Sequence, residues 1–182
     1  MMPPGTGPPP TIPPLAGLGS HADAARIGYS VDEGVRRLLR YHWVEQRLAW
    51  IGTAHLTATP EWEVKCALAL HQWLDTEHAA AIQRRVGEMR RPAPRMDRAP
   101  DPQLDAFFEE ALRAEDTVEL LVGLYDVARR ALIAAYREHL AVTNPLVDHP
   151  TRRVLREALA EHEDALVWGD AALAALRAQG GA

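Results

Sequence analysis

The sequence predicts an all-α fold, a bundle of four long helices, and three observations carry this prediction. Four segments of roughly 25–30 residues repeat apolar side chains at helical spacing. The polar–apolar alternation of strands and the glycine-containing turns of hairpins are missing from the sequence. The links between the segments are short, long and short in chain order, so a hairpin, a lengthwise crossover between helices 2 and 3, and a second hairpin are expected.

Residues 1–29 are predicted to form a tail and a lead-in that precede the domain. Residues 1–19 hold seven of the 14 prolines and four of the 12 glycines. Such a composition cannot build a packed core, and it is typical of disordered or polyproline-II segments. The helical domain is therefore expected to span residues 30–179.

The first two helices are predicted from their start signals. Ser30, which is followed by an acid three residues later, has the signature of a capping box. The helix that it begins is expected to continue to about Leu56. Thr59 is a favourable N-cap and Pro60 suits a first helical position, so the second helix is expected to run from there to Met89.

The second half of the chain contains a long connection and two further long helices. Residues 90–102 contain four prolines and predict an irregular link. A short helix is expected over residues 102–113, and a long one over residues 114–142. The NPLVDHP stretch at 144–150 ends that helix, and the last helix is expected over residues 150–178.

Composition limits the classes of function. The length of 182 residues, with 47% hydrophobic and 25% charged residues, is ordinary for one globular domain. The net charge of −5 gives no reason to expect a nucleic acid or an anionic membrane as partner. The single Cys66 suits a reducing compartment, and neither an ordinary signal peptide nor an apolar run of 18 residues is present, so a cytoplasmic location is expected. A homodimer is left open.

Polar residues interrupt the apolar faces of the predicted helices. His71, Asp75 and His78 are spaced i, i+4 and i+7, on one side of the second helix. Every other long helix also carries an acid or a histidine near its apolar line. The whole set is His42, Glu45, His71, Asp75, Glu77, His78, Glu115, Glu119, Glu161 and His162. Buried carboxylates that converge from several helices need a neutralising cation, and oxygen ligands combined with imidazoles suit iron or manganese.

With these residues, the chain resembles the ferritin-like di-iron carboxylate superfamily over about residues 30–178. That superfamily uses one glutamate from each of two helices and an acid-x-x-His pair from each of the other two. Glu45 and Glu119 match the single glutamates, and Asp75-x-x-His78 matches one pair, with aspartate in place of the usual glutamate. The phrases WEVKCALALHQWLDTEH and NPLVDHPT are similar to those of stand-alone bacterial ferritin-like proteins of undefined activity.

The fourth helix departs from the superfamily pattern. Leu159, not an acid, stands three residues before His162, and Glu161 lies next to the histidine. The resemblance therefore implies the metal ligands Glu45, Asp75, His78, Glu119 and His162, with supporting or alternative ligands His42, His71, Glu77, Glu115 and Glu161. Whether one or two ions bind per chain is left open.

The expected function is that of a non-haem metal protein, with iron or alternatively manganese, that oxidises a small-molecule substrate with O2 or peroxide. The alternative is a metal-free helical bundle that serves as a binding or assembly module and contains a buried polar network. Iron storage is a weaker interpretation, because no run of surface acids is evident. The five tryptophans are expected to fill the core and interfaces, with a pocket-lining role as the alternative.

Overall fold

The computed structural model describes residues 12–180, and every regular element in that range is helical, which confirms the all-α class. The expectation of a disordered tail lies outside the described residues where it concerns residues 1–11. The elements are the 3₁₀ turn η1 (Pro14–Gly17), the helices α1 (His21–Ala25), α2 (Val31–His55), α3 (Trp62–Met89), α4 (Pro102–Ala111) and α5 (Thr117–Leu121), the π-helix η2 (Val122–Arg129), and the helices α6 (Arg130–Val142) and α7 (His149–Gly180).

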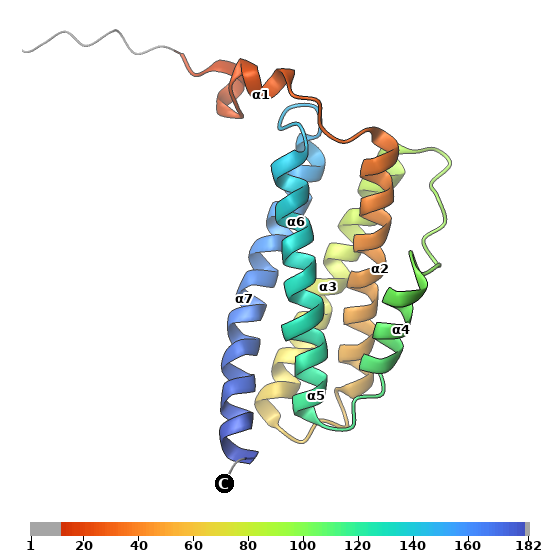
Figure 1. Ribbon diagram of the computed structural model, residues 1–182, viewed down its shortest axis with the longest axis vertical. Helices are drawn as coiled ribbons and strands as arrows, with labels where there is room; N and C mark the ends of the chain where they lie inside the picture. The colour runs from red at the N-terminus through yellow and green to blue at the C-terminus, as the bar shows by residue number, and fades with distance from the viewer. Residues whose placement is uncertain (1–11, 181–182) are drawn as a thin grey trace, which may run out of the picture.

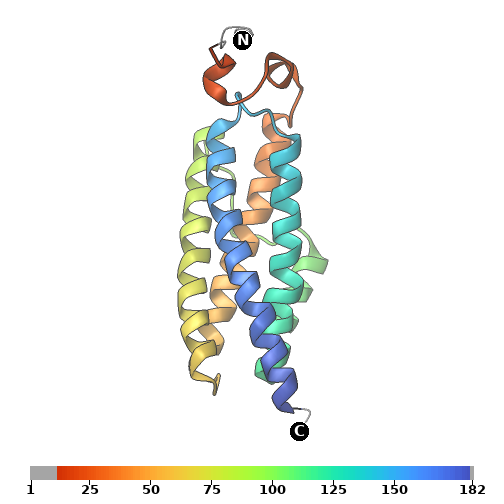
Figure 2. The same ribbon diagram turned by 90° about the vertical axis from the view of Figure 1, so that its left-hand side faces the viewer.

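The long helices lie side by side in an elongated stack (Figures 1 and 2). α2 and α3 are antiparallel neighbours, and α5, η2 and α6 form one continuous rod that is antiparallel to α7. After α3 the chain passes along the outside of α2, through α4, to the opposite end of the stack, where α5 begins (Figure 1). α3 and the α5–η2–α6 rod therefore run in the same direction.

The helix starts agree with the sequence in one place and correct it in another. The hydroxyl of Ser30 accepts a hydrogen bond from the backbone N–H of Glu33 at 3.2 Å, as an N-cap should. The prediction that Thr59 caps α3 is wrong. α3 begins at Trp62 after Glu61, and the Thr59 hydroxyl donates instead to the carbonyl of His55, at the end of α2. In the short link between α2 and α3, this threonine therefore provides a hydrogen bond to one of the free carbonyls at the C-terminus of α2.

The lead-in is more structured than the sequence predicts. Ser20 and Asp23 form a complete capping box at the start of α1. The carboxamide of Asn144, in the loop before α7, donates to the carbonyls of Ala24 and Arg26, at 3.0 and 2.8 Å. This asparagine attaches the lead-in to the end of the α6–α7 hairpin.

The core consists of apolar side chains from all the long helices. The largest fully buried ones include Leu38, Leu68, Phe108, Tyr125 and Tyr136. Between residues 12 and 180, none of the helices combines the length and the hydropathy that a membrane span requires. The apolar core is interrupted at mid-height by charged and polar groups.

Candidate functional site

Four candidate ligands meet inside the stack. α2 contributes Glu45, α3 contributes Asp75 and His78, and α7 contributes His162. All four are buried, and one donor atom from each lies within 4.8 Å of the others. The i, i+3 spacing of the α3 pair places both side chains on the face that packs against α2 and α7. Sequence reasoning predicted each of the four.

The third helical rod contributes a residue that sequence reasoning missed, Arg129. Its side chain is 4% exposed and forms a two-pronged ion pair with Asp75, with Nη1 to Oδ1 at 2.8 Å and Nη2 to Oδ2 at 2.7 Å. The same Nη1 lies 2.7 Å from Nδ1 of His162. Complete burial raises the pKa of Asp75, and the guanidinium opposes that rise. The charge of Asp75 therefore depends on Arg129.

Glu45 is the second anionic centre. Its Oε1 accepts a hydrogen bond from the hydroxyl of Tyr136 at 2.6 Å and lies 2.8 Å from Nε2 of His162. A guanidinium can only donate, so Nδ1 of His162 accepts from Arg129 and the ring proton sits on Nε2, which donates to Glu45. Complete burial alone would raise the pKa of Glu45, but the neighbouring His162 and His78 lower it.

His78 is held between two carboxylates. Its Nδ1 lies 3.5 Å from Glu45, and its Nε2 lies 2.7 Å from Glu161, whose side chain is 38% exposed. Burial lowers the pKa of His78, but the hydrogen bonds and charges of these carboxylates outweigh burial and raise the pKa to about 9. The imidazole is therefore protonated near neutral pH. We call the set Glu45, Asp75, His78, Arg129, Tyr136 and His162 the core network.

The fully buried charges of the core network balance. The carboxylates of Glu45 and Asp75 face the guanidinium of Arg129 and the imidazolium of His78. The cation that convergent carboxylates require is thus supplied by protein side chains. Arg129 and Tyr136 lie on the apolar line that also contains Tyr125 and Leu132, which is the same signal that identified the α3 histidines. That signal could have found both residues.

The structure does not bring Glu119 to this group, although the resemblance implies that it is a ligand. Glu119 is exposed in the first turn of α5, where its N–H donates to the capping carboxylate of Asp116 and its Oε2 accepts from the N–H of Glu115. It precedes Arg129 by ten residues, or about 15 Å of helix. Glu119 lies at the start of a helix, where an acidic side chain stabilises the helix N-terminus, and this role explains why it does not reach the core network.

The remaining predicted residues are spread over the molecule. Glu115 and Glu77 are exposed. His71 is buried one helical turn below the core network and pairs through Nδ1 with the hydroxyl of Tyr125, at 2.7 Å. His42 is buried on α2 one turn before Glu45, where it lines a hollow between α2 and α3. Glu161 alone among these touches the core network, through His78.

The spacing of the donor atoms suits a metal ion. Their hydrogen bonds do not suit one, because several of these atoms are already hydrogen-bonded to other protein groups. Both oxygens of Asp75 accept from Arg129. His162 would have to give up its only ring proton to bind a metal through Nε2 while Nδ1 accepts from the guanidinium. Two unit charges about 4 Å apart repel by roughly 4 kcal/mol at an effective dielectric constant of about 20, and a divalent ion beside Arg129 would double that repulsion. The residues present therefore do not fit the di-iron site that the resemblance implies.

Comparisons of this chain with protein-family models, with curated proteins and with solved structures give no match. The function is therefore inferred from the chemistry of the side chains.

Proposed function

We propose that this protein is a metal-independent helical bundle of ferritin-like topology that acts as a binding module. The observation that carries the proposal is Arg129. This fixed cation stands where a ferritin-like site would need a carboxylate and a metal, and it already neutralises Asp75. The antiparallel α2–α3 pair, the outer crossover and the α6–α7 pair support the ferritin-like topology.

The core network serves the fold in this proposal. Each of the four helical rods contributes at least one of its members. A buried polar network is satisfied in one arrangement of its partners, so it favours one register of the helices over alternatives that a uniform apolar core would tolerate. The network thereby keeps the surface of the bundle in a fixed shape.

The binding role is supported by the surface of α2 and α3. A hollow of about 580 Å³ lies between these helices, which is within the usual range for small-molecule sites. Large aromatic side chains are exposed nearby, including Trp50 at 60%. We call this hollow the α2–α3 groove.

Metal loading tests the proposal. Full-length protein is incubated anaerobically with Fe(II), and in parallel with Mn(II), then desalted and submitted to elemental analysis. Wild-type protein is expected to retain no stoichiometric metal. Arg129→Glu exchanges the cation for a third carboxylate and is expected to gain metal, whereas Arg129→Met removes the cation without adding a ligand and serves as the matched control.

One or two ions retained per wild-type chain would overturn the proposal. That result would favour the oxidase function, for which the single supporting observation is the 4.8 Å spacing of the donor atoms. Loading of wild type and Arg129→Glu to the same extent would likewise show that the guanidinium does not block the site.

A further inference from the structure

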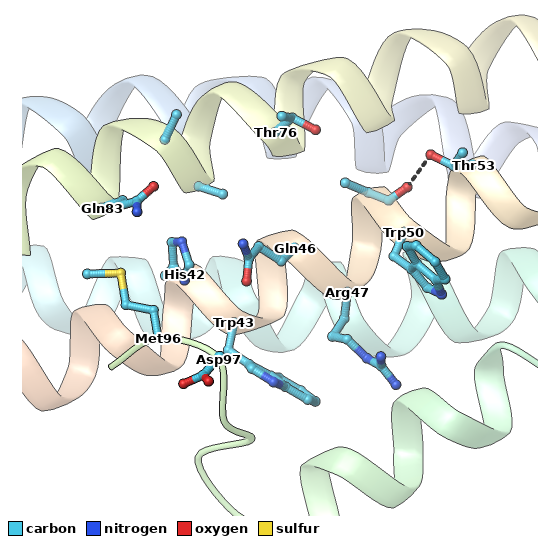
Figure 3. A pocket seen from close by; sticks show the side chains of 13 residues that line it. His42, Trp43, Gln46, Arg47, Trp50, Thr53, Thr76, Gln83, Met96 and Asp97 are labelled. Carbon is cyan, nitrogen blue, oxygen red and sulfur yellow. Dashed lines mark hydrogen bonds between the residues drawn. The ribbon is translucent and has the colours of Figure 1, made fainter. Parts of the chain in front are cut away.

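The α2–α3 groove is built by the side chains of two facing helical stripes. On α2 the residues at i, i+4 and i+8 are His42, Gln46 and Trp50. On α3 the stripe contains Thr76, which lies across from Gln46 in Figure 3, and Gln83, which lies across from His42. The intervening positions are Ala49, Ala79 and Ala80. Because these three side chains are small, the two helices leave a hollow between them.

His42 is the residue that points most directly to a ligand. It is only 2% exposed and it lines the groove, yet its Nδ1 has no hydrogen-bond partner within residues 12–180. A buried polar atom without a hydrogen-bond partner destabilises the folded protein. In the core network the buried histidine His162 has partners on both ring nitrogens. Within the same residues, Nδ1 of His78 and Nε2 of His139 also lack a hydrogen bond, but each of these rings has a partner at its other nitrogen. His42 differs from both because it lines the groove, where a ligand can supply the missing partner.

The groove presents hydrogen-bonding groups without net charge. Gln46 and Gln83 each offer a carboxamide, which has two donor hydrogens and one acceptor oxygen. The two charged residues at its edge have partners elsewhere. Arg47 forms an ion pair with Glu109, and Asp97 lies 3.4 Å from Arg95. A neutral ligand is therefore favoured over an anion or a cation.

An aromatic surface lies beside one of the carboxamides. Trp50 is 60% exposed and stands one helical turn from Gln46. A glutamine carboxamide matches the N6/N7 edge of adenine with two hydrogen bonds, and a flat base stacks on an indole face. His42 lies about 12 Å from Trp50 along α2, so the groove also has polar groups for a substituent beyond the base.

We propose that the α2–α3 groove binds an uncharged purine nucleoside, with the base on Trp50 and against Gln46, and with the hydroxylated sugar towards Gln83 and His42. This assignment rests on the binding function proposed above and names its ligand. It needs no metal and no member of the core network.

Calorimetric titration of the full-length protein with adenosine tests this assignment. Wild-type protein is expected to bind adenosine with a saturable 1:1 isotherm. Trp50→Ala is expected to lower the affinity about ten-fold, because stacking on an aromatic side chain is worth about 1–3 kcal/mol per base. The matched control is Trp62→Ala, which removes a tryptophan that is 72% exposed and does not line the groove. Its affinity is expected to equal that of wild type.

Two further titrations sharpen the test. Ala80→Phe fills the groove from α3 and is expected to abolish binding, with the thermal melt as a check that the helices remain folded. Adenosine 5′-monophosphate is expected to bind no more tightly than adenosine, because the charges at the edge of the groove are already paired.

The assignment is overturned if adenosine gives no isotherm, if Trp50→Ala and Trp62→Ala bind equally well, or if the monophosphate binds much more tightly. These failures differ from failure of the proposed function. If the wild-type protein stays metal-free after loading but does not bind adenosine, only the nucleoside assignment is rejected. If the wild-type protein retains stoichiometric iron, the proposed metal-independent function is rejected, whatever the titration shows.

Discussion

The core network and the α2–α3 groove both contain buried histidines, and the surroundings of these histidines differ: His78 on α3 and His162 on α7 face charged partners, whereas His42 on α2 lines the groove. In the core network, both ring nitrogens of His162 have partners, and His78 is held charged by Glu45 and Glu161. In the groove, burial lowers the pKa of His42, although the charge of Glu45 opposes this effect, and its Nδ1 has no hydrogen-bond partner in the described part of the chain. Within the described residues, Oε2 of Glu45, Nδ1 of His78 and Nε of Arg129 also lack a hydrogen bond, but each of these three groups has an oppositely charged partner through another atom. No such charged partner faces Nδ1 of His42 in that part of the chain.

This difference separates structural polarity from functional polarity. Polar groups that bond mainly to one another contribute to the native state and leave little capacity for a ligand. An unpaired polar atom lowers stability and retains its capacity to bind. The interruption of an apolar stripe is therefore a poor guide to function until the partners of each polar atom are known.

Removal of Arg129 should give the largest effect on stability. Arg129→Met leaves Asp75 buried without its ion pair, and breaking such a pair costs about 3–5 kcal/mol. The free energy of unfolding from guanidinium chloride titrations measures the loss. Arg137→Met is the matched control, because it breaks the exposed pair with Glu163 and should cost less than about 1 kcal/mol.

A second variant distinguishes lost charge balance from lost packing. Adding Asp75→Asn to Arg129→Met removes the unpaired carboxylate, so a large part of the stability should return. If Arg129→Met unfolds at the same denaturant concentration as wild type, the guanidinium does not neutralise the core, and the contrast between the two regions fails.

Two buried tyrosines allow a finer test of the core network. Tyr136 donates to the carboxylate of Glu45 at 2.6 Å, whereas the Tyr125 hydroxyl pairs with the imidazole of His71 at 2.7 Å. Hydrogen bonds to charged groups contribute about 1.5–3 kcal/mol and neutral ones about 0.5–1.5 kcal/mol. Tyr136→Phe should therefore destabilise more than Tyr125→Phe in chemical denaturation. The reverse order would show that Glu45 is not a charged acceptor in the folded protein.

The sequence predicted the helical class because apolar spacing is a local property that each segment carries by itself. It also predicted Glu45, Asp75, His78 and His162 as a group, because each interrupts an apolar line near the middle of its helix. Helix boundaries near Thr59 were predicted less well. There the residue that caps α3 depends on how the short link packs against the end of α2, and the residue types alone do not show this packing.

Arg129 shows why the chemistry of the core could not be predicted as well as its position. An arginine is usually a surface residue, so its place on the apolar line of the third rod carried little weight. Whether it pairs with Asp75 depends on the rotation of that rod, which includes the π-helical segment Val122–Arg129. Glu119 was misplaced for a related reason, since its spacing from the core is set by where α5 begins.

The smallest expected effect concerns His42, and its sign is opposite to the others. His42→Leu replaces a buried imidazole with an unpartnered nitrogen by an apolar side chain of better helix propensity, so the variant should be more stable by about 1 kcal/mol. The pKa of His42 in the folded protein is below that of the unfolded chain. As the pH falls below about 6.5, the unfolded wild type therefore takes up a proton more readily than the folded one, and wild type loses stability that the variant keeps. The advantage of His42→Leu should consequently be larger at pH 5 than at pH 8 in paired denaturation curves. A variant that is less stable than wild type at both pH values would mean that His42 is satisfied within the fold, and the groove would then have no unpaired atom to offer a ligand.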